Sequence, residues 1–194
     1  MMLRLAIFAS GNGSNAQRII EYFEGNPSVT IGMILCNNPG AFVLSRAKNL
    51  GVPATVFTRS DFYETSRVPE LLEKNQIDFL ILAGFIWLIP QNVLKAYQGK
   101  IINIHPALLP KFGGKGMYGM KVHEAVIAAR EPESGITIHF VDEHYDEGRI
   151  IFQARCPVSP ADTPESLAGK IHQLEYRYFP EVIEQTVMRD GELR

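Results

Sequence analysis

LRLAIFASGNGSNAQRIIEYF, residues Leu3 to Phe23, is the stretch that decides the fold. Leu3–Ala9 is an apolar run typical of a buried strand, the glycine loop SGNGSN follows at once, and Ala16–Phe23 has helical spacing. A strand, a glycine loop and a helix in this order form the first unit of many nucleotide-binding α/β sheets. The stretch therefore predicts a Rossmann-like sheet that begins at the N-terminus.

The glycine loop has the properties of an anion cradle. Gly11 and Gly13 allow a tight turn, and the free N–H groups and the dipole of the following helix favour a phosphate. The spacing also fits the dinucleotide fingerprint, but that class needs an acidic residue after the second strand. Here the expected strand Val29–Cys36 runs into Asn37 and Asn38. We therefore predict a monophosphate ligand rather than NAD; the alternative is a glycine turn that binds nothing.

The remaining periodicity extends the same architecture. Further strands are expected at Val52–Phe57, at Ile77–Ala83 and from Ile101, with helices at Ala41–Leu50, Asp61–Lys74, Gln91–Tyr97 and Val122–Ala129. Gly135–Val141 and Ile150–Val158 then alternate strictly, as an antiparallel pair does, and Pro164–Met188 is a long closing helix. The predicted fold class is α/β: a mainly parallel, doubly wound (Rossmann-like) sheet extended by a C-terminal antiparallel pair and a long closing helix, in one domain over residues 1–194.

Composition excludes several classes of function. The 194 residues are 46% hydrophobic with a formal net charge of −2 and no Lys/Arg cluster, so neither nucleic acid nor a membrane is an expected partner. The N-terminus lacks the pattern of a signal peptide, and Cys36 and Cys156 are isolated. We expect a cytoplasmic protein without a metal site.

A second stretch, IINIHPALLP at Ile101–Pro110, carries the candidate chemistry. Asn103 and His105 interrupt an apolar strand two residues apart, so their side chains point to the same face, with Cα atoms roughly 6.5 Å apart. Pro106 ends the strand, which places both side chains at the carboxyl edge where α/β sheets bind ligands. The alternative is a solvated strand end with a satisfied histidine.

Two loops add to this pair. The loop after the first alternating strand holds Asp142, Glu143, Asp146 and Glu147; it is either a solvated acidic turn or the source of a carboxylate that orients His105. Two donors and a carboxylate suit the attack of an amine on a carbonyl carbon, and no Gly-x-Ser-x-Gly nucleophile context occurs. The aromatic-rich segment after the fourth strand is either core or one side of a slot for a flat heterocycle.

Four motifs together resemble one family. They are SGNGSN, LAGF at Leu82–Phe85, NIHPxLLP at Asn103–Pro110, and GxTxHFV with an Asp-x-Gly turn within Gly135–Gly148. In this order and spacing they resemble phosphoribosylglycinamide formyltransferase of purine synthesis, a folate-dependent family of the formyltransferase superfamily. The likeness covers nearly the whole chain, and the first loop is what distinguishes this family within the superfamily.

The resemblance implies a residue assignment. The catalytic residues would be Asn103, His105 and Asp146, and residues 1–100 would be a mononucleotide-binding half, with 101–194 the catalytic and folate-covering half. The implied substrate-binding residues are Gly11, Asn12, Gly13, Ser14, Asn15 and Glu175. The implied folate-binding residues are Phe85, Ile86, Trp87, Leu88, Ile89, Asn103, Asp142, Glu143, His144 and Tyr145.

The chain departs from the family pattern at three places. Asp61 and Trp87 stand where a bacterial relative has arginines, and the segment Phe112–Lys121 is longer and richer in glycine. The remaining histidines have no metal-ligand spacing, although His139 faces the site in the family. The rim of the folate pocket is therefore expected to differ, while the three implied catalytic residues are retained.

The implied activity is transfer of the formyl group of 10-formyltetrahydrofolate, a cosubstrate, to the amine of N1-(5-phospho-D-ribosyl)glycinamide in de novo purine synthesis. Its partners would be these small molecules, and the protein a monomer or homodimer. A formyltetrahydrofolate hydrolase needs the same three residues but usually has an added N-terminal domain, and methionyl-tRNA formyltransferase usually has a basic C-terminal domain. A non-catalytic Rossmann-type nucleotide-binding module is the alternative outside the superfamily.

Overall fold

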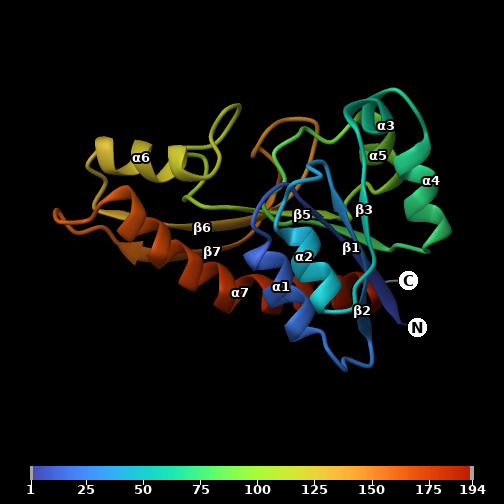
Figure 1. The fold of residues 1–194 in the computed structure, drawn as a ribbon. Helices are drawn as coiled ribbons and strands as arrows, with labels where there is room; N and C mark the ends of the chain where they lie inside the picture. The colour runs from blue at the N-terminus through green and yellow to red at the C-terminus, as the bar shows by residue number, and fades with distance from the viewer. Residues whose placement is uncertain (1, 193–194) are drawn as a thin grey trace.

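Residues 2–192 are described by a computed structural model, in which one mixed sheet runs through the molecule (Figure 1). Its seven strands lie in the order β3-β2-β1-β4-β5-β6-β7. Their bounds are β1 Leu3–Ala9, β2 Val29–Cys36, β3 Ala54–Val56, β4 Phe79–Leu82, β5 Ile101–His105, β6 Glu133–Phe140 and β7 Ile150–Pro157. Strands β1 to β5 are parallel, and β6 and β7 are added antiparallel. The predicted fold class is confirmed.

Helices cover both faces of the sheet (Figure 1). They are α1 Ser14–Tyr22, α2 Val43–Asn49, α3 Arg59–Tyr63, α4 Arg67–Lys74, α5 Gln91–Ala96, α6 Met120–Ala128 and α7 Pro164–Glu192. The first strand shows why two layers are needed, because its side chains alternate between two cores. Leu5 and Ile7 belong to the core under α1, α2 and α7, whereas Ala6 and Phe8 belong to the core under α3, α4 and α5.

The antiparallel half of the sheet sets the register of the site. Asn103 of β5 lies opposite His139 of β6, and β6 pairs in turn with β7. Gly135 permits this close pairing, because a Cβ at that position would lie 1.9 Å from the Ala154 carbonyl oxygen. Helix α7, the predicted closing helix, packs against α1, α6, β6 and β7. It therefore ties the two halves of the sheet together.

One predicted element is wrong. Asp61–Lys74 is not a single helix but the end of α3, a break at residues 64–66, and α4. Thr58 and Asp61 form a capping box, so a helix begins at Arg59 and Asp61 lies in its first turn. The Asp61 carboxylate also binds the Arg67 guanidinium at 2.9 Å, which holds the corner between the two helices.

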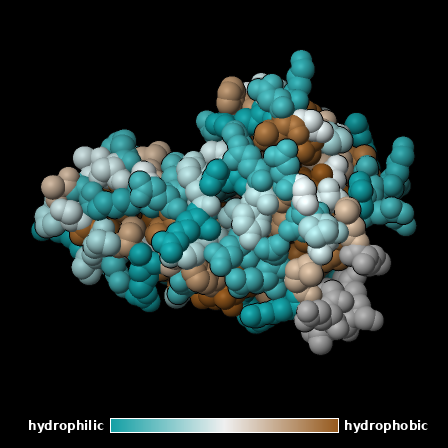
Figure 2. All heavy atoms as spheres, turned by 90° about the horizontal axis from the view of Figure 1, so that it is seen from below, coloured by the Kyte–Doolittle hydropathy of each residue, from teal (hydrophilic) through white to brown (hydrophobic). Residues whose placement is uncertain are grey.

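Hydrophilic side chains cover most of the face seen in Figure 2, and the hydrophobic ones lie in separate small groups. Between residues 2 and 192 there is no helix that is both long and apolar enough to cross a bilayer.

Candidate active site

A cavity of about 580 Å³ opens at the carboxyl ends of β1, β4 and β5. The strand order reverses between β1 and β4, which is the topological switch point where α/β sheets bind ligands. Segments from the whole chain line it: Asn12, Ser14 and Asn15, residues 82–89, 103–106 and 114–119, His123, His139, Val141, 144–146, His172 and Glu175. Both stretches singled out in the sequence therefore meet in one cavity.

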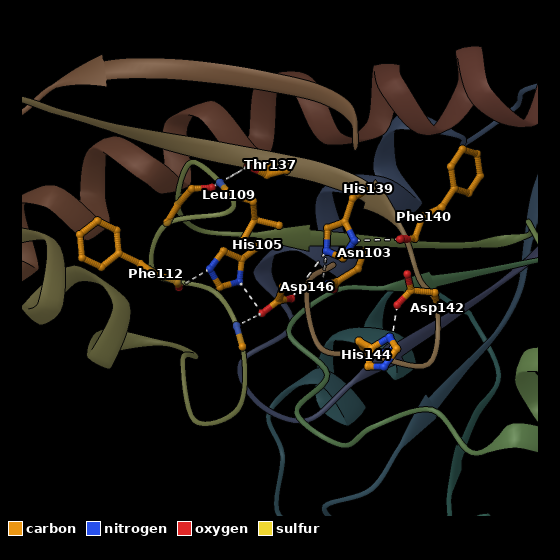
Figure 3. Close-up of polar contacts among 12 residues, drawn as sticks. Asn103, His105, Leu109, Phe112, Thr137, His139, Phe140, Asp142, His144 and Asp146 are labelled. Atoms are coloured by element: carbon orange, nitrogen blue, oxygen red, sulfur yellow. Dashed lines mark hydrogen bonds and ion pairs between the residues drawn. The ribbon is translucent and has the colours of Figure 1, made fainter. Parts of the chain in front are cut away.

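Four polar side chains converge on the floor of this cavity (Figure 3). Asn103 and His105 come from β5, His139 from the opposing strand β6, and Asp146 from the loop that follows it. Asn103 Nδ2 lies 3.1 Å from His139 Nε2, and one Asp146 oxygen lies 3.5 Å from His105 Nδ1. The other Asp146 oxygen lies 3.6 Å from His139 Nε2. The carboxylate thus faces both imidazoles.

Backbone carbonyls fix the proton positions on the two histidines. His139 Nδ1 lies 2.9 Å from the Phe140 carbonyl oxygen, which only accepts, so Nδ1 carries the proton and Nε2 accepts from the Asn103 amide. His105 Nε2 likewise donates to the Phe112 carbonyl oxygen at 2.8 Å. A second proton taken up by His105 must therefore go to Nδ1, the nitrogen that faces Asp146.

The backbone conformation at Asp146 directs its carboxylate toward His105 of β5 and His139 of β6. Asp146 has φ of 58°, in the left-handed region, which Asp tolerates better than most residues. Its Oδ2 also accepts from the Gly114 N–H at 3.0 Å, and so joins this loop to the glycine-rich segment after β5. The carboxylate is fixed from two sides.

Burial and charge oppose each other in this cluster. Burial lowers the pKa of His105, and the Asp146 charge offsets only part of that effect. Burial alone would raise the pKa of Asp146, but the two neighbouring imidazoles in their protonated form and the Gly114 N–H outweigh it and hold that pKa below its usual value. At neutral pH the carboxylate is ionised and the free His105 ring is mostly neutral.

The glycine loop between β1 and α1 presents unpaired donors. Gly13 has φ of 76° and packs so closely on α2 that a Cβ there would lie 2.4 Å from Val43 Cγ2. The first N–H groups of α1 have no intrahelical acceptor, and no side chain caps them. Among the described residues, none accepts from the N–H of Asn12 or Ser14. This is the arrangement expected for a phosphate site.

Glu175 of α7 lies beside this loop. It is 6% exposed and accepts from Asn15 Nδ2 at 2.9 Å. Burial raises its pKa to about 7, which the Asn15 hydrogen bond opposes. Asn15 Oδ1 is buried and has no partner among the described residues, so this corner of the cavity keeps an unused acceptor next to a titratable acid.

The aromatic segment after β4 forms the opposite wall. Phe85 packs edge-on against Phe8, with 5.3 Å between the ring centres, so it contacts the core and also lines the cavity. Trp87 also lines the cavity, and the Arg59 guanidinium lies 5.9 Å from its ring centre. The Ser10 hydroxyl, at the end of β1, accepts from the Ile86 N–H at 3.2 Å, which joins this wall to the glycine loop.

Most implied site residues line the cavity, but four do not. Gly11 and Gly13 shape the turn without lining it, and Asp142 and Glu143 lie outside the described lining. Asp142 instead accepts from the His144 N–H at 2.9 Å, which is turn chemistry. His144 and Tyr145 do reach the cavity.

Two further histidines line the cavity and are not among the implied site residues. His123 of α6 is 3% exposed, its Nδ1 has no described partner, and burial lowers its pKa to about 4. His172 lies on α7 one turn before Glu175, and burial lowers its pKa as well. The three-residue spacing of His172 and Glu175 was a usable signal, since such residues share a helix face. Within residues 2–192 no group of three or more potential ligands could hold a metal ion.

The fold and the site define an α/β protein of the Rossmann-like class, with an amide, imidazole and carboxylate cluster beside a phosphate-type loop. The chain belongs to the formyl transferase family, whose sequence profile matches residues 3–183. It is 42% identical over 186 residues to a chloroplastic phosphoribosylglycinamide formyltransferase of Vigna unguiculata, covering 93% of this chain and 60% of that protein. It is 37% identical over 189 residues to the phosphoribosylglycinamide formyltransferase of Bacillus subtilis (strain 168), covering 95% and 94%.

Solved structures show the same likeness. The glycinamide ribonucleotide transformylase 1 of Geobacillus kaustophilus superposes with a TM-score of 0.86 at 39% identity, covering 94% of this chain and 97% of that one. The phosphoribosylglycinamide formyltransferase of Bacillus halodurans superposes with a TM-score of 0.84 at 37% identity, with 94% of both chains covered. The chain thus spans 60% of the length of the Vigna relative but nearly all of the Bacillus ones.

Proposed function

We propose that this protein transfers the formyl group of 10-formyltetrahydrofolate to the amine of N1-(5-phospho-D-ribosyl)glycinamide, a step of de novo purine synthesis. The observation that carries the proposal is the meeting of the glycine loop with Asn103, His105 and Asp146 in one cavity. The loop belongs to residues 1–100 and the three catalytic candidates to residues 101–194. The family and the names of its relatives support this substrate pair.

The two substrates would enter from different sides. The loop from Gly11 to Asn15 would hold the phosphate by its N–H groups, and Glu175 would hold the glycinamide end. The wall at residues 85–89, with His144 and Tyr145, would bind the folate ring. In this arrangement the amine meets the formyl carbon above Asn103 and His105.

The reaction then needs no covalent intermediate on the protein. The neutral amine attacks the formyl carbon, a C–N bond forms, and the carbonyl oxygen becomes an oxyanion. Asn103 donates its second amide hydrogen to that oxyanion, since the first goes to His139. Protonated His105 stabilises that oxyanion by its positive charge, because its Nε2–H donates to the Phe112 carbonyl oxygen and its Nδ1–H faces Asp146. The intermediate collapses as the bond to the folate N10 breaks, and the amine proton goes to that nitrogen.

Asp146 would stabilise the protonated state of His105. Its carboxylate lies 3.5 Å from the nitrogen that takes the proton, and the negative charge raises the pKa that burial has lowered. The cost of charging a buried ring is thereby reduced during the reaction. This is the role of the acid in a histidine–carboxylate pair.

The direct test is to mix the purified protein with both substrates and to follow the absorbance change on release of tetrahydrofolate. Formation of tetrahydrofolate and formylated product only in the complete mixture supports the transferase. Release of tetrahydrofolate without the amine substrate would show a hydrolase instead. NAD binding without folate binding would indicate a nucleotide-binding module and contradict the proposal.

A further inference from the structure

Arg46 of α2 lies behind the glycine loop, outside the described cavity lining. Its Nε donates to the Asn12 carbonyl oxygen at 2.9 Å, and its second terminal nitrogen donates to Asn12 Oδ1 at 2.7 Å. We infer that Arg46 is a positioning residue of the phosphate cradle, acting on the ligand through Asn12. The inference rests on the proposed function and goes beyond it, because no implied site residue lies on α2.

The charge of Arg46 is not neutralised by a carboxylate. In the described part of the chain it forms no ion pair, and its hydrogen-bond acceptors are the neutral oxygens of Asn12 and Gln17. A guanidinium with neutral partners leaves a full positive charge directly behind the loop. That charge favours an anion on the opposite side, over and above the helix dipole.

The hydrogen bond from Arg46 to the Asn12 carbonyl oxygen also affects an N–H donor of the glycine loop. This carbonyl belongs to the same peptide group as the Gly13 N–H, so a charged donor on the oxygen polarises the N–H at the other end. The fork-shaped guanidinium holds the Asn12 backbone and side chain together, which a single ammonium group cannot do. Asn12 is therefore presented to the cavity in one orientation.

Other contacts fix Arg46 itself. Its third nitrogen donates to Gln17 Oε1, and Gln17 Nε2 donates to Glu21 at 2.7 Å, which sets the direction of the Gln17 amide. The guanidinium carbon lies 4.9 Å from the ring centre of Phe42. Phe42 is 55% exposed and lies outside the core, and its ring face stabilises the Arg46 guanidinium by a cation–π contact.

The loop is also tied to α2 through the backbone. The Val43 N–H donates to the Gly11 carbonyl oxygen at 3.1 Å, and Gly13 packs against the Val43 side chain. Helix α2 thus supports both ends of the turn, while Arg46 holds its middle. Loss of Arg46 would loosen Asn12 without removing these backbone contacts.

The test is the Arg46→Met variant, with Arg18→Met as a matched control. Arg18 lies on α1, is exposed and pairs with Glu21, so the control removes the same charge without touching the loop. For Arg46→Met we expect the KM of the phosphorylated amine to rise about 10-fold or more, with kcat and the KM of the folate within about 2-fold. Arg18→Met should leave all three values unchanged.

A binding measurement separates this inference from the proposed function. Ribose 5-phosphate titrated by calorimetry should bind Arg46→Met about 10-fold more weakly than wild type, with a smaller dependence on salt. Arg46→Lys keeps the charge but not the fork, so its affinity should fall between the two. If wild type forms product and Arg46→Met binds ribose 5-phosphate like wild type, the inference is overturned and the function stands. If wild type neither binds nor transfers, the proposed function fails.

Discussion

Glu175→Gln is the perturbation that the structure predicts in most detail. The carboxyl group is 6% exposed, and its pKa rises from 4.5 to about 7 in the fold. Glutamine has the shape of the protonated acid and keeps an oxygen to accept from Asn15 Nδ2. The variant therefore mimics the neutral form at every pH and removes the titration.

The size and sign of the effect follow from linkage. Below pH 4.5 the group is protonated in both the folded and unfolded states, so wild type and variant should be equally stable. Between pH 4.5 and 7 the unfolded wild-type chain releases a proton that the folded protein retains, and its stability falls with rising pH. Above pH 7 the free energy of unfolding of Glu175→Gln should exceed that of wild type by about 3 kcal/mol.

Urea unfolding of both proteins without ligand, at intervals from pH 4.5 to 8.5, measures this difference. Glu181→Gln removes one charge from an exposed position on the same helix and shows how much of the change comes from net charge alone. A difference between Glu175→Gln and wild type that does not vary with pH would refute the reasoning. It would mean that Glu175 is not held in its protonated form by burial.

Two further predictions concern Gly135 in the sheet and the carboxylate of Asp146. In urea unfolding, Gly135→Ala should lower the free energy of unfolding by at least about 2 kcal/mol, since the new Cβ would lie 1.9 Å from the Ala154 carbonyl oxygen. The control is Gly169→Ala, whose new Cβ would meet nothing within 4 Å and which should be neutral or stabilising. Asp146→Asn should lower the pKa of His105 further, as read by NMR, because the carboxylate raises it, and should cut turnover about 10²-fold or more. An unchanged His105 titration in that variant would contradict the pairing.

Much of the fold was readable from periodicity. The alternation in the two C-terminal strands, the apolar runs of the parallel strands and the loop before α1 each follow from local sequence, and they predicted the layers correctly. The shared face of Asn103 and His105 follows from the two-residue repeat of a strand and needs no tertiary knowledge. The start of α3 at Arg59 was missed although its signal, Thr58 followed by Asp61, is also local.

The features of the site that the sequence could not predict depend on contacts between segments that lie far apart in the chain. The position of His139 opposite Asn103 requires the register of β5 and β6, which no local pattern sets. His123 and His172 reach the cavity because α6 and α7 lie over it, and Arg46 reaches Asn12 because α2 packs on the loop. In the acidic loop, Asp146 faces His105 while Asp142 accepts from the His144 N–H, and a folate-binding role of Asp142 stays a prediction.

The proposed mechanism depends on Asn103 donating to an oxyanion formed beside the phosphate cradle, and steady-state kinetics of Asn103→Ala tests this role most directly. With the fold verified by thermal unfolding and both KM values near wild type, kcat should fall about 10² to 10³-fold, as for the loss of other oxyanion donors. A folded Asn103→Ala protein with kcat near that of wild type would contradict the account.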